Sequence, residues 1–200
     1  MTAICLELHT VLVSGAPGHS PTRQLVSLGM ASADGRRFYA VNADVPLQVA
    51  IEQLPRKVWS ALPLLQDPIL LDRLDPDVVP LKEMKAAFEA FLGQLEEPEF
   101  WSMHGNADHS SLTDVFGYDV EALLPDHFPR WISSVREYRA RVLDRVGQQN
   151  PERLRHLQQT GEGVLWPLFL PTRCAFKNAH RVLTILQRTE QLAGQSEVSR

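Results

Sequence analysis

Residues 100–109 read FWSMHGNADH, and this stretch indicates the fold most directly. Its first half is a short apolar and aromatic run of the kind that forms a buried strand, and Gly105 then permits a sharp turn. Asp108 and His109 open a short helical pattern that Gly117 ends. The stretch therefore predicts a strand, a turn and a helix that presents one carboxylate at its start.

The N-terminal segment predicts an antiparallel meander. Residues 3–10 are short and apolar, as in a central strand. Residues 24–33 and 36–42 are two further β-rich runs, joined at Asp34 and Gly35. Because Asp-Gly tolerates positive φ at both positions, we expect a hairpin with a two-residue turn.

Helical patterns fill much of the remaining chain. They cover residues 80–95, with an apolar stripe that should pack on the sheet, 129–146 with Pro129 at its start, 151–160, and Thr172 to about Leu192. A meander, a helix, a strand and further helices form a mixed α/β order. We therefore expect an α/β, ribonuclease-H-like mixed sheet, in which an antiparallel three-strand meander continues into parallel strands and helices cover both faces.

Length and composition predict a single domain. The 200 residues, 44% of them apolar, suffice for one core, which we place at residues 1–192 with a flexible tail at 193–200. No apolar run reaches the roughly 18 residues of a membrane span, and no leader pattern opens the chain. Cys5 and Cys174 form no CxxC pair. We expect a cytoplasmic protein without a membrane segment.

Three stretches resemble the small single-domain 3'-5' exoribonucleases of bacteria, the ribonuclease-T-like, DEDDh group. Residues 24–41 combine a Leu-x-Ser-x-Gly strand, an Asp-Gly turn and an aromatic strand, and residues 100–117 combine an aromatic strand, a glycine, Asp-His and a short helix. Residues 128–131 match a Pro-Arg-aromatic helix start. The likeness spans about residues 3 to 190. It implies a ribonuclease-H-like fold and phosphodiester hydrolysis with two divalent cations, Mg²⁺ or Mn²⁺.

The resemblance assigns five candidate catalytic residues. The family uses Asp-x-Glu on the first strand, where this chain has Glu7 and His9, and the period of two still puts both on one face. Asp108 matches the acid after the middle strand. Arg173 and Asn178 stand where the family has its general-base His and last Asp. Since a guanidinium cannot accept a proton from water, we expect ordinary two-metal hydrolysis to be impaired or absent.

The metal prediction has two branches. Glu7, His9 and Asp108 could together hold one Mg²⁺ or Mn²⁺, or a Zn²⁺, or the chain binds no metal. The alternative for His9 is a hydrogen-bonded interior histidine. Of the two histidines near Asp108, His104 and His109, at least one should lie at the surface.

Three functions stay open. The first is a degraded exonuclease-like protein that binds the 3' end of single-stranded RNA or DNA, with Arg173, Lys177 and Arg130 meeting phosphates. The second is an active metal-dependent 3'-5' exoribonuclease with a site rearranged around Glu7, His9 and Asp108. The third is a non-catalytic protein-interaction module, including a homodimer, on the same fold.

Overall fold

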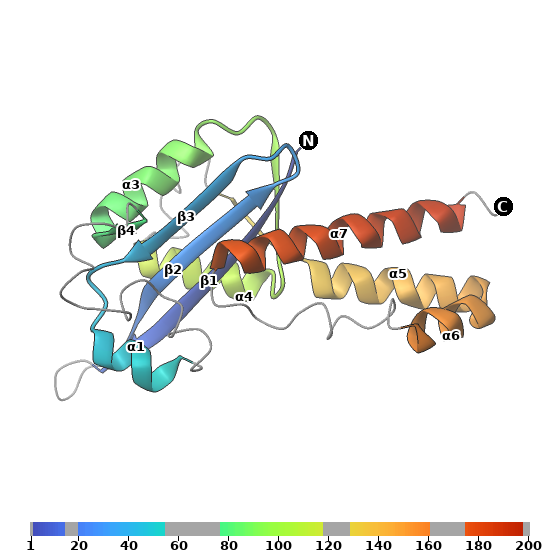
Figure 1. Cartoon of the computed structure of the whole chain (residues 1–200), viewed down its shortest axis with the longest axis horizontal. Helices are drawn as coiled ribbons and strands as arrows, with labels where there is room; N and C mark the ends of the chain where they lie inside the picture. The colour runs from blue at the N-terminus through green and yellow to red at the C-terminus, as the bar shows by residue number, and fades with distance from the viewer. Residues whose placement is uncertain (1, 15–19, 55–76, 118–128, 161–174, 198–200) are drawn as a thin grey trace.

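The structure is a computed structural model that describes residues 2–14, 20–54, 77–117, 129–160 and 175–197. The strands are β1 (Thr2–Val13), β2 (Thr22–Ser32), β3 (Arg37–Asn42), β4 (Val78–Val79), β5 (Pro98–Ser102) and β6 (Ser133–Ser134). The helices are α1 (Leu47–Gln53), α3 (Leu81–Leu92), α4 (Asn106–Phe116), α5 (Val135–Gln149), α6 (Pro151–Gln159) and α7 (Ala175–Glu197). Figure 1 shows α5 and α7 side by side, extending beyond one end of the sheet, with α6 folded back at their far end.

The strands of the described residues form one mixed sheet in the order β4-β3-β2-β1-β5-β6. The pairs β1–β2 and β2–β3 are antiparallel, whereas β1–β5, β5–β6 and β3–β4 are parallel. Strand β1 lies in the interior of the sheet, as residues 3–10 predict. The α/β fold class is thereby confirmed: a mixed sheet with helices on both faces, compatible with a ribonuclease-H-like fold.

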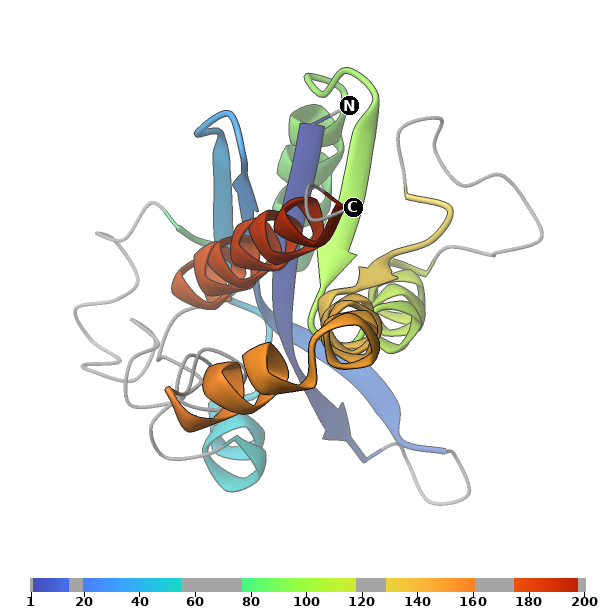
Figure 2. The same ribbon diagram turned by 90° about the vertical axis from the view of Figure 1, so that its right-hand side faces the viewer.

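Two apolar cores lie on opposite faces of β1. Ile4 and Leu6 point into one core, which α3 and α4 close with Met84, Phe88, Leu112 and Phe116. Cys5 points into the other, which α5 and α7 close with Val135, Ala179, Val182 and Ile185. Figure 2 shows α7 crossing one face of the sheet while α3 lies behind it. The apolar stripe predicted for residues 80–95 is confirmed, because Met84, Phe88, Phe91 and Leu92 are the buried residues of α3.

The β2–β3 turn differs from the prediction in type. Gly35 has φ 90°, but Asp34 does not adopt positive φ. The Gly35 N–H donates to the Ser32 carbonyl (3.1 Å) and the Ser32 N–H to the Arg36 carbonyl (2.9 Å), so the loop contains three residues. The Asp34 carboxylate accepts from the Ser32 hydroxyl (2.5 Å) and from Arg36 Nε (2.9 Å), which stabilises this turn instead.

The start of α5 also differs from the prediction. We expected a helix from Pro129, whereas α5 begins at Val135. Residues 133–134 instead pair with β5 as a short parallel strand, and the Ser134 hydroxyl accepts the Glu137 N–H (3.2 Å) as the helix cap. Pairing with β5 satisfies the backbone of this segment without a helix.

Helix α7 continues past Leu192 to Glu197, so part of the predicted tail 193–200 is helical. Leu192 and Ala193 pack against a small cluster formed by Val142, Val146 and Leu157 of α5 and α6. This packing stabilises the extra turn. Thr172, the predicted cap of this helix, lies outside the described residues, and α6 is confirmed at Pro151–Gln159. No helix in the described ranges is both long enough and apolar enough to cross a membrane.

Gly105 permits the turn from β5 into α4. Its φ of 58° and ψ of −118° are a combination that side chains disfavour. A Cβ at this position would lie 2.9 Å from Ser134 Cβ and 3.1 Å from the Ile132 carbonyl oxygen. The chain before β6 therefore crosses directly over Gly105.

We predict that Gly105→Ala destabilises the fold by about 2–4 kcal/mol, because strain and a backbone clash act together. Gly117→Ala is the matched control: Gly117 has φ 64° but nothing within 4 Å of an added Cβ. Its cost should be only about 1–2 kcal/mol. Urea unfolding measures both, and equal losses would contradict a close approach at Gly105.

Candidate functional site

Strand β1 presents Glu7 and His9 toward the side covered by α7. Cys5 packs in the core with α7, and the alternation of a strand puts Glu7 and His9 on the same face. On β2, Gly29 lies opposite Glu7 and Ser27 opposite His9.

Glu7 holds its carboxyl group in an enclosed position. Its Oε2 atom is buried and has no hydrogen-bond partner among the described residues. Burial, and secondarily the negative charge of Asp108, raises the pKa of Glu7 to about 8. Glu7 is therefore predominantly protonated at neutral pH.

His9 is partly buried and hydrogen-bonded. A hydrogen bond of 2.9 Å joins His9 Nδ1 to the Ser27 hydroxyl, and the choice between a structural and a ligand role for His9 stays a prediction. Burial lowers the pKa of His9 to about 4, so the imidazole is neutral at pH 7. Ser27 is a site residue that the sequence did not reveal, because the register of β1 against β2, across the loop between them, decides that it faces His9.

Asp108 lies in the first turn of α4, and its Oδ2 accepts the His104 N–H at 3.3 Å. Its charge raises the pKa of Glu7, so the two acids lie close enough to interact electrostatically although 101 positions separate them in the sequence. The parallel pairing of β1 with β5 brings them together, because α4 begins just beyond the end of β5. His104 is exposed and His109 is buried, which confirms that one of the two lies at the surface.

Helix α7 contributes Asn178 and Lys177. Asn178 is fully buried on the helix face that packs on the sheet, whereas Lys177 is exposed. Arg173 lies outside the described residues, and Arg130 is exposed just before β6. The structure thus places Glu7, His9 and Asn178 between the sheet and α7, with Asp108 approaching from α4. The catalytic roles assigned to these residues stay predictions.

The described residues supply few ligands for a two-cation site. Two divalent cations need several anionic oxygen ligands, whereas the carboxyl groups that the described residues bring to this region are Asp108 and Glu7, whose pKa burial raises. Among the described residues, no group of three or more His, Cys, Asp or Glu side chains is placed to hold a metal ion. One ion bound by Glu7, His9 and Asp108 stays a prediction.

Comparison with known proteins finds no matching family model and no similar curated protein. The resemblance to exoribonucleases therefore stays a prediction. A functional assignment depends on the fold and on the residues around β1, α4 and α7.

We predict that stability falls by about 2 kcal/mol between pH 6.5 and about 8. Glu7 titrates at about 8 in the folded chain instead of 4.5, so the folded state binds more protons over this interval and stability is lost as pH rises. His9 acts oppositely, because its lowered pKa makes stability rise with pH from about 4 to 6.5. The two effects oppose each other below pH 6.5, and Glu7 dominates above it.

Glu7→Gln should remove the decline, since an amide of the same shape does not ionise. Urea unfolding of the wild type and the variant across this pH range measures the difference. The decline should also persist in His9→Gln, because the titration of His9 in the wild type ends at lower pH. A decline that is unchanged in Glu7→Gln would contradict the assignment to Glu7.

Proposed function

We propose that this chain is an exonuclease-like protein that binds the 3' end of single-stranded RNA or DNA and hydrolyses phosphodiester bonds weakly or not at all. The sheet order and the approach of Glu7 and Asp108 support an inherited nuclease-type pocket. The observation that carries the proposal is the Glu7 carboxyl group, whose Oε2 atom is buried without a hydrogen-bond partner among the described residues. The resemblance assigns Glu7 the place of a metal ligand, and burial raises its pKa, which favours the neutral form that a ligand cannot use.

The charge of the pocket supports binding rather than cleavage. A protonated Glu7 and a neutral His9 leave Asp108 as the negative group in this part of the site. Phosphate then meets less repulsion, and Lys177, exposed at the start of α7, supplies a positive charge. Arg130 adds another exposed cation beside α4, and Arg173 belongs to the proposal from the sequence alone.

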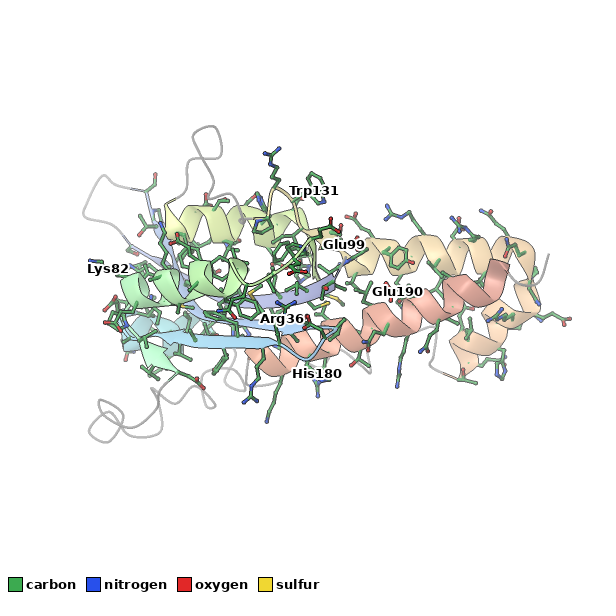
Figure 3. The ribbon with its side chains drawn as sticks, turned by 90° about the horizontal axis from the view of Figure 1, so that it is seen from above. Arg36, Lys82, Glu99, Trp131, His180 and Glu190 are labelled. Atoms are coloured by element: carbon green, nitrogen blue, oxygen red, sulfur yellow. The ribbon has the colours of Figure 1, made fainter. Side chains whose placement is uncertain are left out.

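We predict that short single-stranded RNA or DNA binds with an affinity that falls steeply as salt rises, because phosphate contacts release counterions. Lys177→Ala should weaken binding to every sequence and reduce the salt slope by about one. Fluorescence anisotropy of a labelled strand measures both effects. Lys82 is exposed on α3, on the opposite face of the sheet (Figure 3). Lys82→Ala removes the same charge and should change neither the affinity nor the salt slope.

A strand that does not bind the wild type at any salt concentration would contradict the proposed function. Binding with a flat salt response would contradict the role of phosphate contacts. Equal effects of Lys177→Ala and Lys82→Ala would show that net charge matters rather than the position of Lys177.

One observation favours the second function, an active metal-dependent exoribonuclease. The buried Oε2 of Glu7, which has no partner among the described residues, leaves an oxygen atom free to bind a cation that displaces its proton. Under this alternative, labelled RNA incubated with Mg²⁺ or Mn²⁺ is shortened from its 3' end, and Asp108→Ala abolishes the shortening. Cleavage that Asp108→Ala leaves unchanged would come from a contaminant.

A further inference from the structure

A surface depression of about 310 Å³ opens next to the candidate site. Its polar and aromatic lining includes His104, Asn106, Trp131, Ser133, Glu137 and Arg141. His104 lines the depression and its N–H donates to the Asp108 carboxylate, so the depression borders the start of α4 that carries Asp108. None of these lining residues belongs to the metal or catalytic set that the sequence predicted.

The depression lies where two neighbouring parallel strands diverge. After β5 the chain enters α4, which packs in the core on one face of the sheet, and after β6 it enters α5, which packs with α7 on the other face. In open α/β sheets, ligands bind outside the carboxyl ends of the strands at the point where the strand order reverses, and here the order reverses between β1 and β5. The depression lies one strand away from that point, at the carboxyl ends of β5 and β6.

Trp131 is held outward at this position. Its side chain is 66% exposed, although the neighbouring Ile132 is 2% exposed and Pro129 is buried. His109 Nε2 donates to the Pro129 carbonyl oxygen (2.8 Å), which attaches the segment to α4. Figure 3 shows Trp131 projecting from the surface near α4 and α5. Contacts of the flanking residues thus hold the backbone on both sides of Trp131.

The lining has the chemistry of a site for an unpaired base. An indole ring offers a flat apolar face on which a base of any sequence can stack, and Arg141 on α5 can meet the adjoining phosphate. The Asn106 amide and the Ser133 hydroxyl line the same space and can hydrogen-bond to a base or a sugar. A duplex would not fit this site, because pairing and stacking hide the faces of its bases.

We propose that this depression binds one unpaired base of the single strand by stacking on Trp131, with Arg141 contacting the neighbouring phosphate. This inference rests on the proposed function and adds the subsite that positions the strand beside Asp108. A lone exposed tryptophan would be ordinary on a protein surface. Its fixed backbone, the cation beside it and the diverging strands together distinguish this position.

The test titrates the full chain with short labelled single-stranded RNA and DNA of mixed sequence. Trp131→Ala should raise the Kd by about 5- to 100-fold, the range expected for loss of one stacked base, whereas Trp131→Phe should stay within about threefold. Arg141→Ala should reduce the salt slope by about one. The fluorescence of Trp131 is the excess of the wild-type signal over that of Trp131→Phe. Strand binding should quench this Trp131 fluorescence.

Leu12→Ala is the matched control, because Leu12 is the other large hydrophobic side chain exposed among the described residues, at 48%. Leu12 lies near the C-terminal end of β1. Its substitution should leave binding unchanged. Equal affinities of Trp131→Ala and wild type, with Lys177→Ala still weakened, would overturn the base subsite alone. Absence of binding by the wild type would overturn the proposed function and the subsite together. Near-ultraviolet circular dichroism and urea unfolding confirm that each variant is folded.

Discussion

The close approach of the Gly105 backbone to residues 132–134 sets the positions of both candidate surfaces. On one side of this contact, β5 turns into α4 and carries Asp108 toward Glu7. On the other side, the same contact holds the segment that pairs as β6 and exposes Trp131. A side chain at Gly105 would separate these segments, so the absence of a Cβ holds the candidate site and the depression close together.

The charge state of the candidate site follows from the burial of its side chains. Enclosure between the sheet and α7 makes the ionised form of Glu7 costly and keeps His9 neutral. In a two-metal nuclease, cations would offset such burial by binding to ionised carboxylates. Here a hydrogen bond joins His9 and Ser27, whereas the buried Oε2 atom of Glu7 has no hydrogen-bond partner among the described residues. The raised pKa of Glu7 and the lowered pKa of His9 both favour neutral side chains in this region, which is the charge state that the proposed phosphate binding needs.

Elements with strong local patterns were predictable from the sequence. Helix α3 has an apolar stripe that matches its buried face, and α4 ends at Gly117 in the left-handed conformation that a terminal glycine favours. Predictions failed where a distant segment supplied the deciding contact. Residues 129–134 begin like a helix, but the last two pair with β5 as a strand. Helix α7 is longer than predicted because its end packs on α5 and α6.

The order of residue types was enough to place β1 inside a mixed sheet and to put Glu7 and His9 on one face, because alternation is a local property of a strand. It could not reveal that Asp108 raises the pKa of Glu7, that Ser27 binds His9, or that Trp131 stands exposed beside Arg141. Each of these depends on distances between segments far apart in the chain, and such distances exist only once strands have paired and helices have packed across the sheet.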